Sequence, residues 1–135
     1  MKILELEARV ENLPRLLQFT GEELEARGCS MKTQMQLDIA VEEIFVNVAH
    51  YAYGGEPGPV RIVMDISGDP EVFSISFMDQ GTPYDPLAKE DPDVTLSAEE
   101  REIGGLGIFM VKKSMDDMKY EYRDGCNILT LYKKL

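Results

Sequence analysis

Short stretches rich in apolar residues, each bounded by turn residues, recur along the chain and predict five β-strands. The first stretch begins with alternating apolar and charged residues, the period expected of a strand with one buried face. Gly68-Asp69-Pro70 and Asp124-Gly125 each join two of the stretches, and this spacing predicts two β-hairpins. The predicted strands cover residues 3–10, 60–67, 72–78, 119–123 and 127–133.

Helical signals fill much of the remaining chain. A stripe of leucines follows Asn12, a suitable N-cap, and lasts until Gly28, so a first helix is expected there. Ser30 is placed to cap a second helix over about residues 32–52, and a third covers about residues 106–117. The order β-α-α-β-β-loop-α-β-β predicts an α+β fold, a two-layer sandwich with helices on one face of a mixed or antiparallel sheet. A chain of this length, residues 1–135, is expected to form a single domain.

Composition narrows the classes of function. The net charge of −11, from 25 acidic and 14 basic residues, leaves no basic surplus for a nucleic-acid surface. No apolar run approaches the ~20 residues of a membrane span, and the charged N-terminal segment is unlike a secretion signal. We therefore expect a cytoplasmic protein with no direct nucleic-acid partner and no membrane partner. Cys29 and Cys126 are expected to be free thiols, since no metal-ligand spacing surrounds either of them.

The segment between Gly81 and Gly104 shows no convincing periodicity and contains three prolines. Within it, residues 85–103 carry seven acidic side chains against two basic ones. A loop of this length inside a compact domain is usually either functional or disordered.

Glu43 and Asn47 share one face of the second predicted helix, because they are four residues apart. An amide oxygen is a suitable ligand for Mg²⁺, and a carboxylate one turn earlier is placed to accept a proton from a nucleophile beside that metal. The alternative is that Glu43 is solvated and Asn47 makes a local hydrogen bond. On this stretch alone the alternative is the better interpretation.

Asp79 and Gly81 follow the third predicted strand in the stretch Phe77-Met78-Asp79-Gln80-Gly81. An ionised carboxylate accepts a hydrogen bond from the exocyclic amine of adenine, and a glycine beside it lets the backbone approach the base. An ordinary Asp-x-Gly turn after a strand is the alternative.

Glycines also cluster in Gly104-Gly105-Leu106-Gly107, just before the third predicted helix. Closely spaced glycines leave backbone N–H groups free to point at an anion, and the helix dipole adds to the attraction. Neither the GxxxxGK phosphate loop nor the GxGxxG dinucleotide fingerprint occurs in the chain. Taken alone, the cluster is equally compatible with a simple joint between loop and helix.

Together, in this order and at these separations, the three stretches resemble the N box, G1 box and G2 box of the GHKL ATPases. The corresponding ranges are about 39–53, 77–86 and 104–111, with an ATP lid at about 85–103. The resemblance covers nearly the whole chain and implies the Bergerat, or histidine-kinase-like, ATPase fold. The Tyr-Ala-Tyr end of the N box and the last predicted strand make the chain most similar to the anti-sigma factor serine/threonine kinases.

The resemblance implies roles for single positions. Glu43 matches the general base of the family, and Asn47 matches its magnesium ligand. Asp79 matches the aspartate that binds adenine, with Gly81 beside it. Two glycines of the G2 box and a hydroxyl on the last strand complete the implied nucleotide contacts: Gly105, Gly107 and Thr130.

Arg101 is the arginine of the implied lid and is assigned catalysis through the γ-phosphate. Its offset from Gly105 varies within the family, so a surface role balancing neighbouring glutamates stays open. His50 is expected to be a surface or partly buried histidine without a role in the site.

By this resemblance the chain is a kinase that uses ATP and Mg²⁺ to phosphorylate a serine of a STAS-type anti-anti-sigma protein. A sigma factor and a second copy of the chain, forming a homodimer, are implied as further partners. Two alternatives keep the ATP site: an ATP-gated binding module of a phosphatase or regulator switch, and a detached ATPase domain of a histidine kinase.

Overall fold

A single five-stranded sheet carries the fold in the computed structural model, which describes residues 1–88 and 105–135. Every neighbouring pair of strands is antiparallel, so of the two predicted sheet types the antiparallel one is observed. The strands lie in the order β1-β2-β3-β5-β4. Their bounds are Lys2–Glu7 for β1, Pro59–Ser67 for β2, Val72–Asp79 for β3, Asp117–Arg123 for β4 and Cys126–Lys134 for β5.

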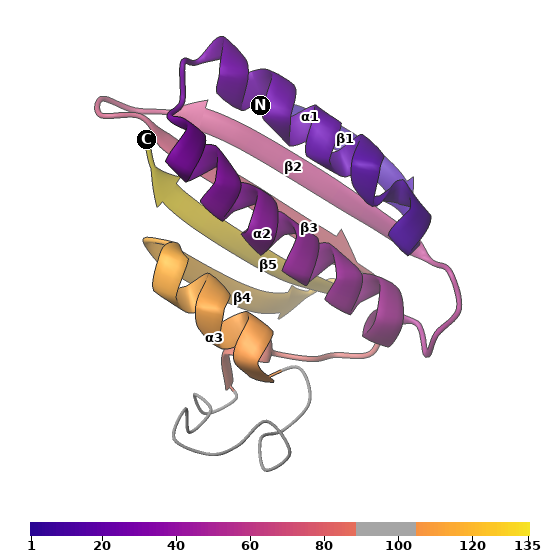
Figure 1. Ribbon diagram of the computed structural model, residues 1–135. Coiled ribbons are helices and arrows are strands. Elements are labelled where there is room, and N and C mark those ends of the chain that lie inside the picture. Colours follow the sequence, from indigo (N-terminus) through magenta and orange to yellow (C-terminus); the bar gives the residue numbers. More distant parts are fainter. Residues whose placement is uncertain (89–104) are drawn as a thin grey trace.

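Three α-helices, α1 (Leu13–Ala26), α2 (Met31–Asn47) and α3 (Gly105–Ser114), lie together on one face of this sheet (Figure 1). In Figure 1, α2 lies between α1 and α3. The predicted α+β sandwich with helices on one face is therefore confirmed. Within residues 1–88 and 105–135, no helix is long and apolar enough to cross a membrane.

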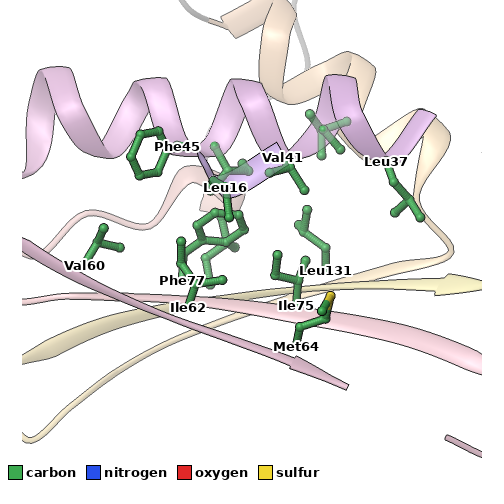
Figure 2. Close-up of a cluster of buried hydrophobic side chains, with 14 of the residues drawn as sticks. Leu16, Leu37, Val41, Phe45, Val60, Ile62, Met64, Ile75, Phe77 and Leu131 are labelled. Carbon is green, nitrogen blue, oxygen red and sulfur yellow. The ribbon is translucent and has the colours of Figure 1, made fainter. Parts of the chain in front are cut away.

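The core forms where the helical layer meets the alternate side chains of the strands (Figure 2). Across the sheet, Ile62, Phe77 and Leu129 stand in one row, and each is buried. Leu16 from α1 and Phe45 from α2, both fully buried, pack onto this surface. The period-two pattern thus fixes which strand residues face the helices.

Local signals explain some element ends, and others differ from the prediction. The side chain of Asn12 makes no capping hydrogen bond to α1, and α3, predicted to reach Asp117, ends at Ser114, so that β4 already begins at Asp117. The Ser30 hydroxyl caps α2 by accepting a hydrogen bond from the N–H of Thr33 at 3.2 Å, as expected. The strand predicted to reach Val10 ends at Glu7 instead, because the Asn12 side chain donates to the Glu7 carbonyl at 2.9 Å. A short 3₁₀ turn, η1 (Val10–Asn12), follows that point.

The second predicted helix also changes its form before its end. Beyond α2 the chain continues as a five-residue π-helix, η2 (Val48–Ala52). π-helical turns are rare in proteins, and those that occur often lie at functional sites. A further 3₁₀ turn, η3 (Pro86–Ala88), follows β3 before the segment that the structure leaves undescribed.

Candidate functional site

A cavity of about 540 Å³ lies among α2, η2, the ends of β3 and β5, and α3. It is mostly apolar with a few polar groups, the usual character of a small-molecule site. Its apolar lining comes from Ile44, Val48, Ala52, Phe77, Pro83, Pro86, Ile108 and Leu129. Its polar lining comes from Asn47, Tyr51, Asp79, Thr82, Tyr84, Tyr120 and Asn127.

Asp79, the last residue of β3, contributes a buried carboxylate to this lining, with only 6% of the residue exposed. Its Oδ1 accepts hydrogen bonds from the N–H of Gly81 and from Nδ2 of Asn127, both at 2.9 Å. No residue in the described part of the chain donates to Oδ2 at hydrogen-bond distance. The carboxylate is thus anchored through one oxygen and keeps acceptor capacity for a ligand in the cavity.

The chain after Asp79 packs closely against the end of η2. A Cβ built on Gly81 would stand 2.1 Å from the carbonyl oxygen of Ala52, which is backbone and cannot swing aside. The same carbonyl accepts a hydrogen bond from the N–H of Thr82 at 3.0 Å. Glycine at position 81 is therefore required by this approach, which sets the edge of the cavity beside Asp79.

Tyr53, the residue after η2, also holds the end of this helix against the neighbouring strands. Its hydroxyl accepts a hydrogen bond from the N–H of Gln80 at 2.8 Å and donates to the carbonyl of Pro59. Burial raises the pKa of Tyr53, so the phenol remains protonated and able to donate around neutral pH. Its ring leaves no room for a side chain at position 58, where a built Cβ would meet ring carbons at 2.4 Å. The end of the helix is thereby tied to both β2 and β3.

Glu43 and Asn47 lie one turn apart on α2 and face the start of α3. Nδ2 of Asn47 donates to Oε1 of Glu43 over 3.4 Å, a long bond, and both side chains are partly buried. A Cβ built on Gly107 would stand only 1.9 Å from Oε1 of Glu43, so the glycine and the carboxylate are in direct contact. The N box and the G2 box thus meet through these three residues at one end of the site.

Asn127 was not predicted as a site residue, yet it is buried in the lining of the cavity with 6% exposure. Besides Asp79, its amide bonds the loop that follows β3 and the hydroxyl of Tyr120. The signal was present in the sequence, since the alternation that points Leu129 and Leu131 inward also points Asn127 inward.

The predicted residues are not all brought together. Asn47 and Asp79 line the cavity. Gly81 bonds Asp79, Glu43 bonds Asn47, and Gly107 contacts Glu43, as described above. Thr130 lies on the opposite face of the sheet, where its hydroxyl is 2.7 Å from that of Ser76, so the structure does not bring it to the cavity.

Other sequence expectations have simple outcomes. Gly105 begins α3, while Arg101 and residues 89–103 of the predicted lid lie outside the described residues. His50 is exposed, and Cys29 and Cys126 are free thiols, as predicted.

A family model described as the Histidine kinase-like ATPase domain matches residues 6–133. The chain is 33% identical over 107 residues to the serine-protein kinase RsbW of Listeria monocytogenes serovar 1/2a (strain ATCC BAA-679 / EGD-e). That match covers 76% of this chain and 67% of the relative. It is 28% identical over 103 residues to the serine/threonine-protein kinase BtrW of Bordetella bronchiseptica, over 76% of this chain and 71% of the relative.

A solved structure also shares the fold. The crystal structure of the RsbU and RsbW domains of Rv1364c from Mycobacterium tuberculosis matches with a TM-score of 0.69 and 15% sequence identity. The match covers the whole of this chain and 33% of that longer one. The resemblance inferred from the three boxes is therefore confirmed, and the chain belongs to the histidine kinase-like ATPase domain family, with serine-protein kinases of the RsbW type among its relatives.

Proposed function

We propose that this protein is an ATP-dependent protein-serine/threonine kinase that phosphorylates a STAS-type anti-anti-sigma protein. The observation that carries the proposal is that Asp79 and Asn47, from separate segments, line one cavity, while Glu43 bonds Asn47 and contacts Gly107. The names of the relatives, serine-protein kinases and a serine/threonine-protein kinase, support the same class of reaction.

The adenine end of the site is assigned to Asp79. Its Oδ2, which accepts no hydrogen bond from residues 1–88 and 105–135, suits the exocyclic amine of adenine, a hydrogen-bond donor, and disfavours guanine, which presents a carbonyl there. The flat apolar lining beside it, with Ile44, Phe77 and Leu129, suits the faces of a purine ring. The residues present therefore fit an adenine nucleotide.

The phosphate end is assigned to the contact between α2 and α3. Asn47 would hold Mg²⁺ through its amide oxygen, since its amide nitrogen is already bonded to Glu43. The metal would supply charge neutralisation on the phosphates. Gly105 and Gly107 lie in the first turn of α3, and the backbone N–H groups of this helix N-terminus would bind phosphate oxygens.

Glu43 then acts on the protein substrate. Its carboxylate accepts the proton of the seryl hydroxyl as the seryl oxygen forms its bond to the γ-phosphorus. The bond between that phosphorus and the β–γ bridging oxygen breaks, and ADP leaves. We assign Arg101 to the γ-phosphate in the same step, as implied by the resemblance.

The partners and location are part of the proposal. A sigma factor sequestered by a homodimer of this chain is proposed from the resemblance to anti-sigma factor kinases. A cytoplasmic location follows from the same role. Direct binding of nucleic acid or of a membrane is not proposed.

Incubation of the purified chain with γ-labelled ATP, Mg²⁺ and candidate STAS proteins tests the proposal. Label on a serine of the STAS protein is the expected result. Label on histidine would instead indicate a histidine-kinase ATPase domain. Tight ATP-dependent binding without transfer would indicate a nucleotide-gated binding module and would overturn the kinase assignment.

A further inference from the structure

The amide of Asn127 lies at the point where β5, the end of β3 and the following loop meet. Its Nδ2 is 2.9 Å from Oδ1 of Asp79, 3.0 Å from the carbonyl of Thr82 and 3.4 Å from the carbonyl of Gly81. Its Oδ1 accepts a hydrogen bond from the N–H of Tyr84 at 3.0 Å and another from the Tyr120 hydroxyl. This one buried side chain therefore bonds the sheet and the loop at once.

The bonding partners leave only one orientation for the amide. The N–H of Tyr84 can only donate, so the atom facing it must be the amide oxygen. The carbonyl of Thr82 and an ionised carboxylate on Asp79 can only accept, so the atom facing them must be the amide nitrogen. A side chain at position 127 that lacked either capacity would leave buried groups unpaired.

We infer that Asn127 is the positioning residue for adenine recognition. It acts through Asp79 and has no need to touch the base itself. The inference rests on the proposed function, because it explains how the proposed adenine acceptor is held. Nδ2 of Asn127 and the N–H of Gly81 both bond Oδ1 of Asp79, so turning the carboxylate out of this position loses one buried and one part-buried hydrogen bond. Oδ2, to which no described residue donates, is thereby left as the acceptor for the exocyclic amine.

Tyr120 supports this arrangement from β4. Its hydroxyl donates to Oδ1 of Asn127, and its side chain also lines the cavity. Burial raises the pKa of Tyr120, so the phenol remains a donor across the neutral range. With this donor on its oxygen, the Asn127 amide directs its nitrogen at Asp79 and the loop carbonyls.

A purely structural role for Asn127 makes a different prediction from a positioning role. Loss of a structural residue weakens every ligand of the cavity alike. Loss of a positioning residue weakens ATP more than an analogue without the exocyclic amine, because only the amine uses Oδ2 of Asp79. The ratio of the two affinities therefore separates the roles, whatever happens to stability.

Asn127→Thr and Asn127→Val are the matched variants for this test. Both side chains are β-branched, suit a strand and have nearly the same shape, and both lose the contacts to the loop carbonyls. Only the threonine hydroxyl can still donate to Asp79. Any difference between the two variants thus reports the bond from position 127 to Asp79 and leaves the loop contacts out of the comparison.

The experiment measures dissociation constants of ATP and of purine riboside triphosphate, with Mg²⁺, by titration calorimetry. Wild-type chain should bind ATP about tenfold or more tightly than the analogue, the expected effect of one charge-assisted hydrogen bond. Asn127→Thr should keep most of this ratio and Asn127→Val should lose most of it. In an Asp79→Ala background the two variants should give the same ratio, because no acceptor remains to be positioned.

Tyr120→Phe and Tyr132→Phe supply a milder pair. Each removes one phenolic hydroxyl, but Tyr132 lies on the opposite face of the sheet. Tyr120→Phe should reduce the ATP-to-analogue ratio several-fold, and Tyr132→Phe should leave it at the wild-type value. This pair keeps the inference testable if the Asn127 variants fold poorly in thermal melts.

Two failures can be told apart. If the wild-type chain binds no adenine nucleotide, the proposed function fails and the inference fails with it. If the wild-type chain binds ATP selectively and both Asn127→Val and Asn127→Thr keep the wild-type ratio of ATP to analogue affinity, only the inference is overturned. An equal loss of ATP and analogue in Asn127→Val would likewise assign Asn127 a structural role alone.

Discussion

Gly107 of α3 and Glu43 of α2 are in direct contact, and a Cβ at position 107 would stand 1.9 Å from Oε1 of the carboxylate. The atom in the way is the far end of a flexible side chain, so the carboxylate can move while the backbone stays in place. Position 107 therefore controls where the proposed base points, in addition to any contact with phosphate.

We predict that Gly107→Ala lowers the rate of phosphoryl transfer about tenfold or more with little loss of stability. The added methyl displaces the Glu43 carboxylate, and small misplacements of a catalytic group cost large factors in rate. Initial rates with labelled ATP and denaturant unfolding curves measure the two effects. A variant that transfers phosphate at the wild-type rate would contradict the role of this contact.

Gly81→Ala should behave differently, because its Cβ would meet the backbone carbonyl of Ala52 at 2.1 Å. A backbone atom cannot yield cheaply, so we expect destabilisation of about 1–3 kcal/mol, as for an overpacked site. Gly21→Ala is the matched control: nothing lies within 4 Å of its built Cβ, and it sits inside α1. That variant should gain roughly 0.5–1 kcal/mol through helix propensity. Urea unfolding measures the change in the free energy of unfolding for both variants, and we expect a decrease for Gly81→Ala and an increase for Gly21→Ala. Changes of the same sign would refute the packing argument.

Local patterns in the sequence were sufficient to predict most of the fold. The second hairpin depended on Asp124-Gly125, and both residues adopt the positive φ values, 54° and 77°, that such a turn requires. The end of the first strand was predicted less well, because the bond that fixes it runs from Asn12 to Glu7 and leaves no trace in the apolar pattern. The π-turn at the end of α2 was likewise invisible to a periodicity of 3.6.

The site was predictable where its geometry is local. Glu43 and Asn47 follow from a helical spacing of four, and Asp79 and Gly81 follow from the end of a strand. The alternation along β5 indicated that Asn127 points inward, but its bond to Asp79 joins residues 48 positions apart, which only the sheet register brings together.

Thr130 illustrates the same limit. It lies three residues after Asn127 along β5, and an odd offset in a strand places it on the other face. The resemblance supplied the residue type for that position but not the direction of its side chain. The register between β3 and β5, together with the alternation of side chains along β5, decides which residues of β5 face the cavity.

Asp79→Asn should preserve the fold while removing adenine selectivity. An asparagine at this position can keep its oxygen towards the N–H of Gly81 and Nδ2 of Asn127, which satisfies both buried donors. Its amide nitrogen then faces the cavity as a donor in place of an acceptor. We expect ATP affinity to fall about tenfold or more, since a hydrogen bond to a charged group contributes ~1.5–3 kcal/mol. Titration with ATP and GTP checks this, and equal wild-type affinity for both would remove Asp79 from base recognition.

Glu43→Gln and Asn47→Ala should separate chemistry from nucleotide binding. Glutamine keeps an oxygen for Nδ2 of Asn47 but cannot take a proton, so transfer should fall about 10²–10⁴-fold with nucleotide affinity nearly unchanged. Asn47→Ala removes the proposed metal ligand and should weaken both transfer and the Mg²⁺ dependence of ATP binding. The neighbouring Glu42 is exposed and is not among the residues that line the cavity, so Glu42→Gln serves as the charge-matched control for Glu43→Gln. Dissociation constants with Mg²⁺ and with EDTA, beside single-turnover rates, distinguish the three variants. Full transfer activity in Glu43→Gln would leave the kinase without its base. An Asn47→Ala variant that still binds ATP in a Mg²⁺-dependent way would assign the metal to other ligands.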